Sequence, residues 1–312
     1  MINILKNLYR SYSFYKVPKK IKLNFVKLTK NYEENMRTFL VGNYFRNETE
    51  INEQDLEDHI KQRVNLARSK ILPWVLRTID LKNKKLLEVG SGTGSSSIAF
   101  SEQGAIVTGI DVDATSIEVA KYRSNLLNQK IEYINLSGVE IKQIENNYDV
   151  ILYYACLEHM TISERIESLQ QAYSKLNKSG FLVIVEAPNR LWIEDTHTSE
   201  LPFFQWLPDD LAYLYSKFSP KGSFNSRYTD NEFNYLAEFH RRGRGVSYHE
   251  FDLAFENYEN LEIVSSLNRL VYSKNLLNTF LYKKIYKLYL KQFTNKNKAF
   301  VEEYLDLIIQ KK

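Results

Sequence analysis

Cysteine is nearly absent from the 312-residue sequence. Cys156 stands alone, so an intramolecular disulfide framework is excluded and nothing argues for an oxidising compartment. Long apolar runs are also missing: none approaches the roughly 18 residues of a membrane-spanning helix, and residues 1–16 lack the continuous apolar core of a signal peptide. We therefore expect a cytoplasmic protein. Its 44% hydrophobic and 26% charged residues are ordinary for a globular chain with one large domain and appendages.

Acidic residues are missing from the first thirty positions, which hold eight lysine and arginine side chains. The whole chain has a formal net charge of +4, whereas the residues after position 30 have 34 basic and 38 acidic side chains. The positive charge therefore belongs to an N-terminal arm, and a core that binds nucleic acid over a broad face usually looks different. We expect this amphipathic arm to pack on its own core or on a partner subunit, or to contact an anionic membrane surface.

Two common kinds of site lack their characteristic spacing. No His-x-x-x-His or Cys-x-x-Cys pair occurs, so we predict no metal site. No Gly-Lys-Ser or Gly-Lys-Thr follows the glycine cluster at 90–94, which excludes a phosphate-binding P-loop.

Residues 86–94 combine a strand with a glycine-rich turn. A short apolar run, 86–89, interrupted only by Glu88, is typical of a parallel strand buried on both faces. Three glycines follow at alternate positions: Gly90, Gly92 and Gly94. Glycine accepts positive φ and has no Cβ, so the backbone can turn tightly and a ligand can approach its N–H groups. Residues 95–100 then begin a helix, whose N-terminus favours an anionic ligand group.

A second predicted strand, 105–110, ends at Asp111. A carboxylate at a strand tip soon after a glycine loop suits the two hydroxyls of a ribose, so this segment predicts a nucleoside-binding βαβ unit. A dinucleotide is disfavoured, because Ser95 stands where the fingerprint G-x-G-x-x-G has its last glycine. Glu88 would also repel a pyrophosphate, although it tolerates an ammonium group.

The spacing Glu88-x-Gly90-x-Gly92-x-Gly94, followed by Asp111, resembles the first two motifs of class I S-adenosylmethionine-dependent methyltransferases. The resemblance implies S-adenosylmethionine as the cofactor. Its α-ammonium, sulfonium and ribose agree with the charges of the two acidic residues. The resemblance also implies cofactor contacts from eight positions: Glu88, Gly90, Ser91, Gly92, Gly94, Asp111, Val112 and Ser137.

Ser137 marks a departure from the family's pattern. In the resembled family the third strand often ends in a Gly-Asp pair whose carboxylate holds the adenine amino group, whereas Leu136-Ser137 stands here. A serine hydroxyl can still form a hydrogen bond with the adenine.

Strands and helices alternate five times between residues 85 and 185 without a repeated sequence, which predicts an α/β fold with a doubly wound, mostly parallel sheet. The resemblance covers residues 62–190 and implies the same Rossmann-like fold, with a helical N-terminal arm and C-terminal helices. The expected divisions are a basic arm and helical cover at 1–61, a methyltransferase domain at 62–270 with a substrate-facing insertion at 186–228, and a helical extension at 271–312. The insertion is rich in aromatic residues and prolines, and long irregular loops are usually functional.

Two histidines follow predicted strand ends, where open α/β sheets bind their ligands. Leu157-Glu158-His159 comes directly after the fourth strand, and the resembled family often has Leu-Glu-His lining its active site. His197 follows the fifth strand, inside the insertion. A hydroxyl acceptor must lose a proton and imidazole is the usual base, so we predict His159 or His197 as the catalytic base, with His159 favoured. Each could instead be structural, hydrogen-bonded at a helix start or packed in a loop.

Five further side chains are predicted to bind the acceptor: Glu158, Arg190, Arg241, Arg244 and His249. The segment around Arg190 and His197 resembles a subgroup of bacterial class I methyltransferases of small molecules and glycans, with an insertion after strand five. Arginines between glycines at 241–245 could clamp a phosphate or carboxylate with paired N–H groups. Basic residues at a helix C-terminus are also favourable without any ligand, so both interpretations stay open.

We predict an S-adenosylmethionine-dependent methyltransferase for a small-molecule or glycan-type acceptor, with oxygen as the favoured acceptor atom. Nucleic-acid amino-methyltransferases have an Asn/Asp-Pro-Pro-aromatic tetrad after strand four, and residues 153–156 are not one, so no nucleic acid is expected. Two alternatives remain: a nicotinamide-dependent oxidoreductase, and a non-catalytic module that binds S-adenosylmethionine. A lipid-linked acceptor would suit the basic arm and the lysine-lined helix predicted at 275–292, which could hold the enzyme at the inner membrane face. The oligomeric state is left open by the sequence.

Overall fold

The computed structural model describes residues 23–48, 50–221, 236–257, 259, 261–267, 276–294 and 297–312. Most of the predicted basic arm, residues 1–22, and the end of the predicted insertion, residues 222–228, lie outside the described residues. The chain divides into two compact units. Unit 1 comprises Met1–Tyr154, Gln171–Val183 and Ile308–Lys312, and unit 2 comprises Ala155–Gln170 and Ile184–Leu307.

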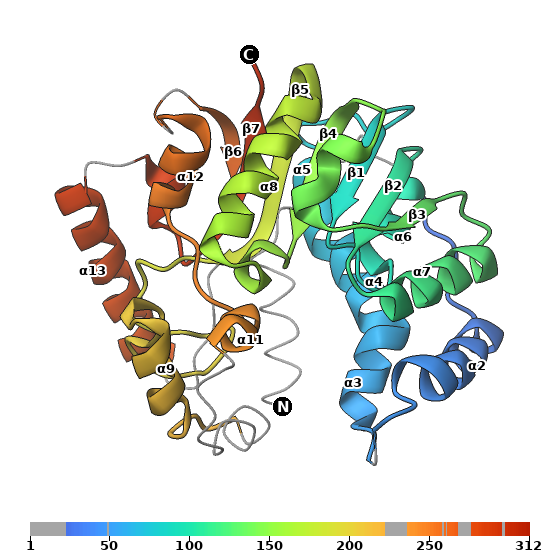
Figure 1. Cartoon of the computed structure of the whole chain (residues 1–312), viewed down its shortest axis with the longest axis horizontal. Helices are drawn as coiled ribbons and strands as arrows, with labels where there is room; N and C mark the ends of the chain where they lie inside the picture. The colour runs from blue at the N-terminus through green and yellow to red at the C-terminus, as the bar shows by residue number, and fades with distance from the viewer. Residues whose placement is uncertain are drawn as a thin grey trace. The chain divides into compact units, whose positions relative to one another are not determined.

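A seven-stranded sheet has the strand order β3-β2-β1-β4-β5-β7-β6 (Figure 1). The strands are β1 (Lys85–Val89), β2 (Ile106–Asp111), β3 (Glu132–Asn135), β4 (Tyr148–Tyr154), β5 (Leu176–Pro188), β6 (Glu262–Ser266) and β7 (Tyr304–Gln310). In unit 1, β1 pairs in parallel with β2 and β4, and β2 pairs in parallel with β3. The predicted α/β fold with a doubly wound, mostly parallel sheet is confirmed.

The parallel register aligns the carboxyl ends of three strands in unit 1. Val89 of β1 lies opposite Ile110 of β2 and Tyr153 of β4, and all three side chains are buried. The residues that directly follow these strands therefore start from one edge of the sheet. Open α/β sheets bind their ligands at this edge.

Helices connect and flank the strands of unit 1. They are α5 (Leu72–Val75), α6 (Ser95–Ser101), α7 (Ala114–Leu126) and η4 (Gly138–Gln143), together with α8 (Ile162–Lys175), which belongs to both units. Helices α6 and α7 both contact β2, and α7 also contacts β3. Helix α7 begins where it does because the Asp113 carboxylate accepts hydrogen bonds from the backbone N–H groups of Thr115 and Ser116.

A run of short helices precedes the first strand and forms the helical cover. Its elements are α2 (Lys30–Phe39), η1 (Leu40–Tyr44), α3 (Glu53–Glu57), η2 (Asp58–Gln62), α4 (Arg63–Leu66) and η3 (Ala67–Ile71). Asn52 begins α3 because its side chain accepts from two backbone N–H groups of the first turn. Leu56, Ile60 and Val64 lie one turn apart, are buried and pack with Tyr32 of α2 in a cluster that also contains residues of α6 and α7. The cover therefore shares an apolar core with the helices that flank the sheet.

Strands β5 and β7 run in opposite directions. Lys311, just after β7, donates its N–H to the Gly180 carbonyl near the start of β5 at 2.8 Å. Asn189, just after β5, donates its N–H to the Glu303 carbonyl before β7 at 2.9 Å. The sheet is therefore mixed, with one antiparallel pair at these two strands.

The C-terminal region departs from the expected helical extension at 271–312. Helix α13 (Leu276–Thr294) agrees with it, but the segment that follows forms η10 (Lys298–Val301) and strand β7. The consecutive side chains of Leu307, Ile308 and Ile309 have no exposed surface. Because neighbours in a strand point to opposite faces, both faces of β7 are covered. Acidic residues at 302, 303 and 306 interrupt this apolar pattern, so the sequence did not reveal the strand.

Unit 2 contains the remaining helices around an apolar cluster of its own. These are η5 (Leu157–His159), η6 (Phe204–Trp206), α9 (Asp209–Ser216), α11 (Leu236–Arg241) and α12 (Tyr248–Phe255). Leu201, Phe204, Ala212 and Phe239 form the buried cluster. The predicted insertion is therefore partly helical and contributes to a core, which a structureless loop would not do.

Arg123 of α7 holds the helical cover onto the glycine turn. The side chain is fully buried. Its guanidinium donates to four acceptors: the carbonyls of Thr93 (2.8 Å), Ile60 (3.0 Å) and His59 (2.6 Å), and the hydroxyl of Tyr32 (2.7 Å). One side chain thus fixes α2 and η2 to the residue between Gly92 and Gly94.

We expect Arg123→Ala to lower the free energy of unfolding by roughly 3–5 kcal/mol, because the carbonyls of His59, Ile60 and Thr93 lose the charge-assisted hydrogen bonds that they accept from the guanidinium. Urea unfolding followed by circular dichroism measures this loss. Arg46→Ala is the matched control, since Arg46 is exposed and its removal should change stability by no more than about 0.5 kcal/mol. Equal stability of the two variants would contradict the role of Arg123.

Candidate functional site

The glycine turn between β1 and α6 depends on two different properties of glycine. At Gly94, with φ of 77°, a Cβ would lie 2.5 Å from Tyr133 Oη and 2.9 Å from Ala120 Cβ, so packing excludes a side chain. At Gly92, with φ of 48°, no atom of the described residues lies within 4 Å of the Cβ position. The turn is therefore closed on the protein side at Gly94 and open to a ligand at Gly92.

Asp111 lies at the tip of β2 beside this turn. Its Oδ2 accepts from the Gly92 N–H at 2.8 Å, and its Oδ1 accepts from the Asp113 N–H at 2.9 Å. Burial raises the pKa of Asp111, whereas these backbone N–H groups act in the opposite direction. Each carboxylate oxygen has a second lone pair for a ligand hydroxyl. Val112 next to it is 70% exposed, an apolar surface suited to a flat aromatic ring.

Glu88 lies beneath the turn and not on its open side. The side chain has no exposed surface, and its two oxygens accept hydrogen bonds from the hydroxyls of Ser96 and Ser97. Burial raises the pKa of Glu88 to about 7. The predicted direct contact of Glu88 with the cofactor is thus not supported: its carboxylate is used to hold the first turn of α6, because it points into the core.

Three serine hydroxyls near the turn differ in how they are used. The hydroxyls of Ser91 and Ser95 are buried and have no hydrogen-bond partner among the described residues. An unpaired buried hydroxyl is unfavourable, so a polar ligand at this turn would supply a missing partner. Ser137 instead caps η4, where its hydroxyl accepts from the Val139 N–H at 3.4 Å. Its O–H hydrogen is not used in that cap.

The two predicted histidines of unit 2 meet at one buried carboxylate. Glu158 of η5 has no exposed surface, and its Oε1 lies 3.5 Å from His197 Nε2 and 3.8 Å from His159 Nε2. The two imidazole centroids are 6.2 Å apart. The side chain of His159 is 45% exposed and that of His197 is 27% exposed, so a ligand can reach both rings.

The electrostatics of this cluster favour proton exchange. Burial raises the pKa of Glu158 to about 7, and Glu186 acts in the same direction, while His197 and Arg165 oppose it. Partial burial lowers the pKa of His159, although the hydrogen bond between its Nδ1 and the Arg241 carbonyl at 2.7 Å opposes this. A carboxyl group with a pKa near 7, such as that of Glu158, is suited to general acid–base chemistry.

Arg165 of α8 positions this cluster and was not predicted from the sequence. It is fully buried. Its guanidinium donates to the carbonyls of Leu157 (2.6 Å), Glu158 (3.2 Å), Arg244 (2.7 Å) and Gly245 (3.1 Å) and to the carboxylate of Glu250 (3.0 Å). Arginine is ordinary on a surface helix, so the sequence carries no signal that this one is internal.

Arg244 is directed at internal partners. It is 1% exposed, its Nε lies 2.9 Å from Asp209 Oδ1, and its terminal nitrogens donate to the carbonyls of Phe204 and Leu207. The two terminal nitrogens are occupied by internal carbonyls and hold the insertion together, while the buried Nε forms no hydrogen bond among the described residues. This arrangement gives no support to the predicted substrate contact of Arg244.

The other predicted acceptor contacts are more open. Arg241 is exposed and lies 2.6 Å from Glu164, and Arg190 is partly exposed and donates to the Gln205 carbonyl at 3.0 Å. His249 is exposed on α12 and is not part of the cluster around Glu158 in the described structure. Glu158, His159, His197 and the backbones of Arg241 and Arg244 are thus brought together, whereas the Arg244 guanidinium and His249 are not part of this cluster.

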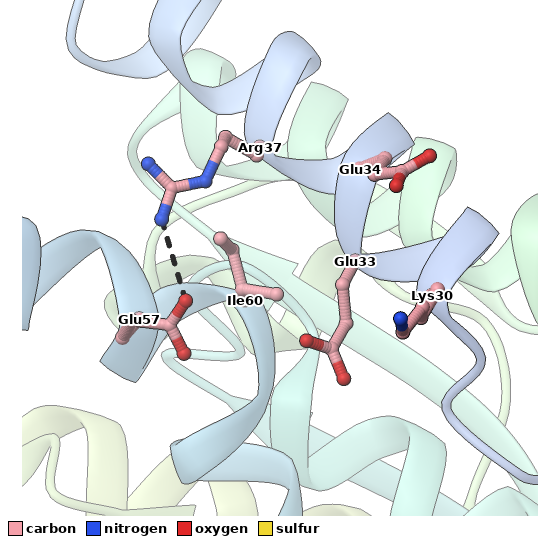
Figure 2. A pocket seen from close by; sticks show the side chains of 6 residues that line it. All are labelled: Lys30, Glu33, Glu34, Arg37, Glu57 and Ile60. Atoms are coloured by element: carbon pink, nitrogen blue, oxygen red, sulfur yellow. Dashed lines mark hydrogen bonds and ion pairs between the residues drawn. The ribbon is translucent and has the colours of Figure 1, made fainter.

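Figure 2 shows a hollow on the helical cover with a volume of about 170 Å³. It is lined by Lys30, Glu33, Glu34, Arg37, Glu57 and Ile60. Arg37 lies 3.3 Å from Glu57, and Lys61 lies 2.6 Å from Glu33. Because its main charges are paired with one another, this hollow is not a candidate site. Within the described ranges, no group of three His, Cys, Asp or Glu side chains has an arrangement that could hold a metal ion.

Comparison with known proteins identifies the segment that contains the glycine turn. Residues 86–180 match the family model described as a methyltransferase domain. The chain is similar to the ubiquinone biosynthesis O-methyltransferase of Dechloromonas aromatica, with 32% identity over 120 residues, 38% of this chain and 50% of that protein. The corresponding enzyme of Vibrio atlanticus is 35% identical over 141 residues, 44% of this chain and 56% of that protein.

Similarity to solved structures is weaker. The magnesium protoporphyrin IX methyltransferase of Synechocystis, solved with bound S-adenosylmethionine, aligns with a TM-score of 0.38 and 18% identity over 53% of this chain and 80% of that one. The chain spans about half the length of the first curated relatives it matches. The matched segment contains the glycine turn, Asp111 and the strands β2, β3 and β4. Residues 86–180 therefore form a methyltransferase domain.

Proposed function

We propose that the protein transfers a methyl group from S-adenosylmethionine to an oxygen atom of a small-molecule acceptor. The observation that carries oxygen as the acceptor atom is the pair of imidazoles on the buried Glu158 carboxylate, because a hydroxyl must lose its proton when it is methylated. The names of the similar O-methyltransferases from Dechloromonas aromatica and Vibrio atlanticus support the same atom.

The residues at the carboxyl ends of β1 and β2 fit the cofactor. S-adenosylmethionine supplies an electrophilic methyl group on a sulfonium centre when bound. Asp111 would hold the ribose hydroxyls, exposed Val112 would contact the adenine, and the open backbone at Gly92 would admit the ligand. The unpaired hydroxyls of Ser91 and Ser95 would gain partners.

His159 is the proposed base, with His197 as the other candidate. His159 follows β4 by five residues, and β4 pairs in parallel with β1, whose end begins the glycine turn. Its Nδ1 is engaged by the Arg241 carbonyl, so its Nε2 is the nitrogen available to take a proton. Arg190 and Arg241 are proposed contacts for polar groups of the acceptor, and a sugar or lipid-linked glycan is one acceptor class of this kind.

A peripheral membrane contact is the second part of the proposal. In the described part of the chain, no helix is long and apolar enough to cross a membrane. Helix α13 has four lysines and no acidic residue, and it exposes four large apolar side chains over about two turns: Leu281, Ile285, Leu288 and Tyr289. Lys283 and Lys287 pair with Glu303 and Glu302, so the exposed apolar stripe is the feature that supports a contact with a membrane surface.

Asp111→Ala should weaken the binding of S-adenosylmethionine at least tenfold, because each lost charge-assisted hydrogen bond contributes about 1.5–3 kcal/mol. Calorimetry measures the dissociation constant. Asp113→Ala is the matched control, since Asp113 caps α7 and should affect stability but not affinity. An unchanged dissociation constant for Asp111→Ala would refute the ribose contact, and binding of a nicotinamide dinucleotide would favour an oxidoreductase.

Turnover of His159→Ala should fall by roughly 10²–10⁴ with an acceptor found by screening hydroxylated aromatics, sugars, nucleotide-sugars and lipid-linked glycans. The affinity for S-adenosylmethionine should stay within twofold, which separates loss of a base from loss of folding. His197→Ala, assayed in parallel, reports the second candidate. Near-normal turnover of both variants would show that the base lies elsewhere, and binding without any transfer would favour a non-catalytic module.

Vesicle sedimentation tests the membrane contact. We expect stronger binding to anionic than to neutral vesicles at low salt, and the double variant Leu281→Ser with Leu288→Ser should weaken it at least tenfold, since each buried leucine contributes roughly 1.5–3 kcal/mol. Leu211→Ser with Leu253→Ser is the matched control, because these leucines are similarly exposed on α9 and α12. Equal binding to both kinds of vesicle, or equal loss in both double variants, contradicts the proposal.

A further inference from the structure

The side chains around Glu158 fix the tautomers of both histidines. His159 Nδ1 lies 2.7 Å from the Arg241 carbonyl oxygen. A carbonyl oxygen only accepts, so this nitrogen carries the hydrogen. In the neutral ring, His159 Nε2 is therefore a bare acceptor, and it is the atom that faces Glu158 Oε1 at 3.8 Å.

The tautomer of His197 follows in the same way from its contact with Thr198. The Thr198 hydroxyl donates its single hydrogen to the Gly243 carbonyl at 3.0 Å. Its oxygen must then accept from His197 Nδ1, 3.3 Å away. His197 Nε2 is thus also a bare acceptor in the neutral ring, and it lies 3.5 Å from the same Glu158 Oε1.

Three proton acceptors therefore face one another: Glu158 Oε1, His159 Nε2 and His197 Nε2. With both rings neutral and Glu158 ionised, no hydrogen lies between them. Neither oxygen of Glu158 has a hydrogen-bond partner among the residues that the structure describes. A buried carboxylate in this state is strongly unfavourable, and two lone pairs directed at it make it more so. One additional proton, on Glu158 or on a facing nitrogen, converts these repulsions into attraction.

The surrounding charges do not replace that proton. Arg165 approaches from α8, but its N–H groups are directed at backbone carbonyls and at Glu250. Arg242 adds positive charge near His159, and Glu186 of β5 adds negative charge near Glu158. The Glu158 carboxylate can therefore be stabilised by a proton on one of the two imidazoles.

We propose that Glu158 is a positioning residue that keeps one resident proton on the nearer ring, His197, and so leaves His159 free as the base. This rests on the proposed methyl transfer to oxygen. His197 is closer to Glu158 and less exposed, so its ion pair with the carboxylate is the better shielded of the two. During transfer, the acceptor's O–H bond breaks and its proton forms an N–H bond with His159 Nε2. Glu158 then lies between two imidazolium rings and offsets their mutual repulsion.

Nitrogen NMR of the cofactor-free full chain, labelled with ¹⁵N-histidine, tests the resident proton directly. We expect His197 Nε2 to be protonated and His159 Nε2 to be unprotonated at neutral pH. His59 is an internal reference for a neutral ring, because burial lowers its pKa to about 3. Both Nε2 atoms unprotonated in the native chain, or the proton on His159, would overturn the proposal whether or not any acceptor is methylated.

Substitutions of Glu158 separate charge from shape. Glu158→Gln keeps the shape and loses the charge, so His197 should lose its resident proton at neutral pH. Glu158→Asp keeps the charge, so His197 should keep most of its resident proton in this variant. A residue that only fills space would show the opposite order, with Gln tolerated and Asp not. Identical histidine spectra for Glu158→Gln and the native chain would therefore contradict the inference.

The kinetic readout uses the acceptor found by screening. With Glu158→Gln, turnover should fall at least tenfold while KM for S-adenosylmethionine is unchanged. The acidic limb of the pH profile should move to lower pH, because removing a negative neighbour makes protonated His159 less stable. Glu158→Asp should recover part of the turnover. If no acceptor is methylated, the proposed function fails. The NMR result still decides whether the resident proton is on His197.

Discussion

Parallel pairing of β1 with β2 and β4 is the constraint on which the rest of the structure depends. It brings Val89, Ile110 and Tyr153 into register, so three chain segments leave the sheet at the same edge. The central side chains of β1, β2 and β4 are buried, so a ligand is reached from the last residue of a strand or from the residues that follow it. The glycine turn, Asp111 and η5 all occupy such positions. The functional residues are concentrated after strand ends for this reason.

Three buried ionisable side chains, Glu88, Arg123 and Glu158, have different kinds of partner. Glu88 is held by two serine hydroxyls, and Arg123 is held by carbonyls and one phenol. In both cases the charged group is enclosed by fixed dipoles and supports local structure. Glu158 differs, because its neighbours are titratable imidazoles. A charge held by fixed dipoles positions the backbone, whereas one held by imidazoles can exchange a proton.

The segment that matches the family contains only some of the residues that the proposed acceptor chemistry requires. Residues 86–180 include the glycine turn, Asp111 and Glu158. His197 and the helical part of the insertion lie beyond that match. The proposed cofactor contacts thus lie in the matched segment, while part of the cluster around Glu158 comes from a segment outside it. A segment outside the shared domain can change the acceptor without disturbing the cofactor site.

Local sequence pattern was sufficient for the alternation of strands and helices, the glycine turn and the position of Asp111, because each depends on residues close together in the chain. Contacts between distant residues decided the rest. They turned Arg244 inward onto Asp209 and buried Glu88 beneath α6. They also placed β7 in the sheet despite its acidic residues, and brought His197 to Glu158. Whether a charged side chain faces solvent, a ligand or the core depends on which partners the fold brings to it, and periodicity in the sequence does not contain that information.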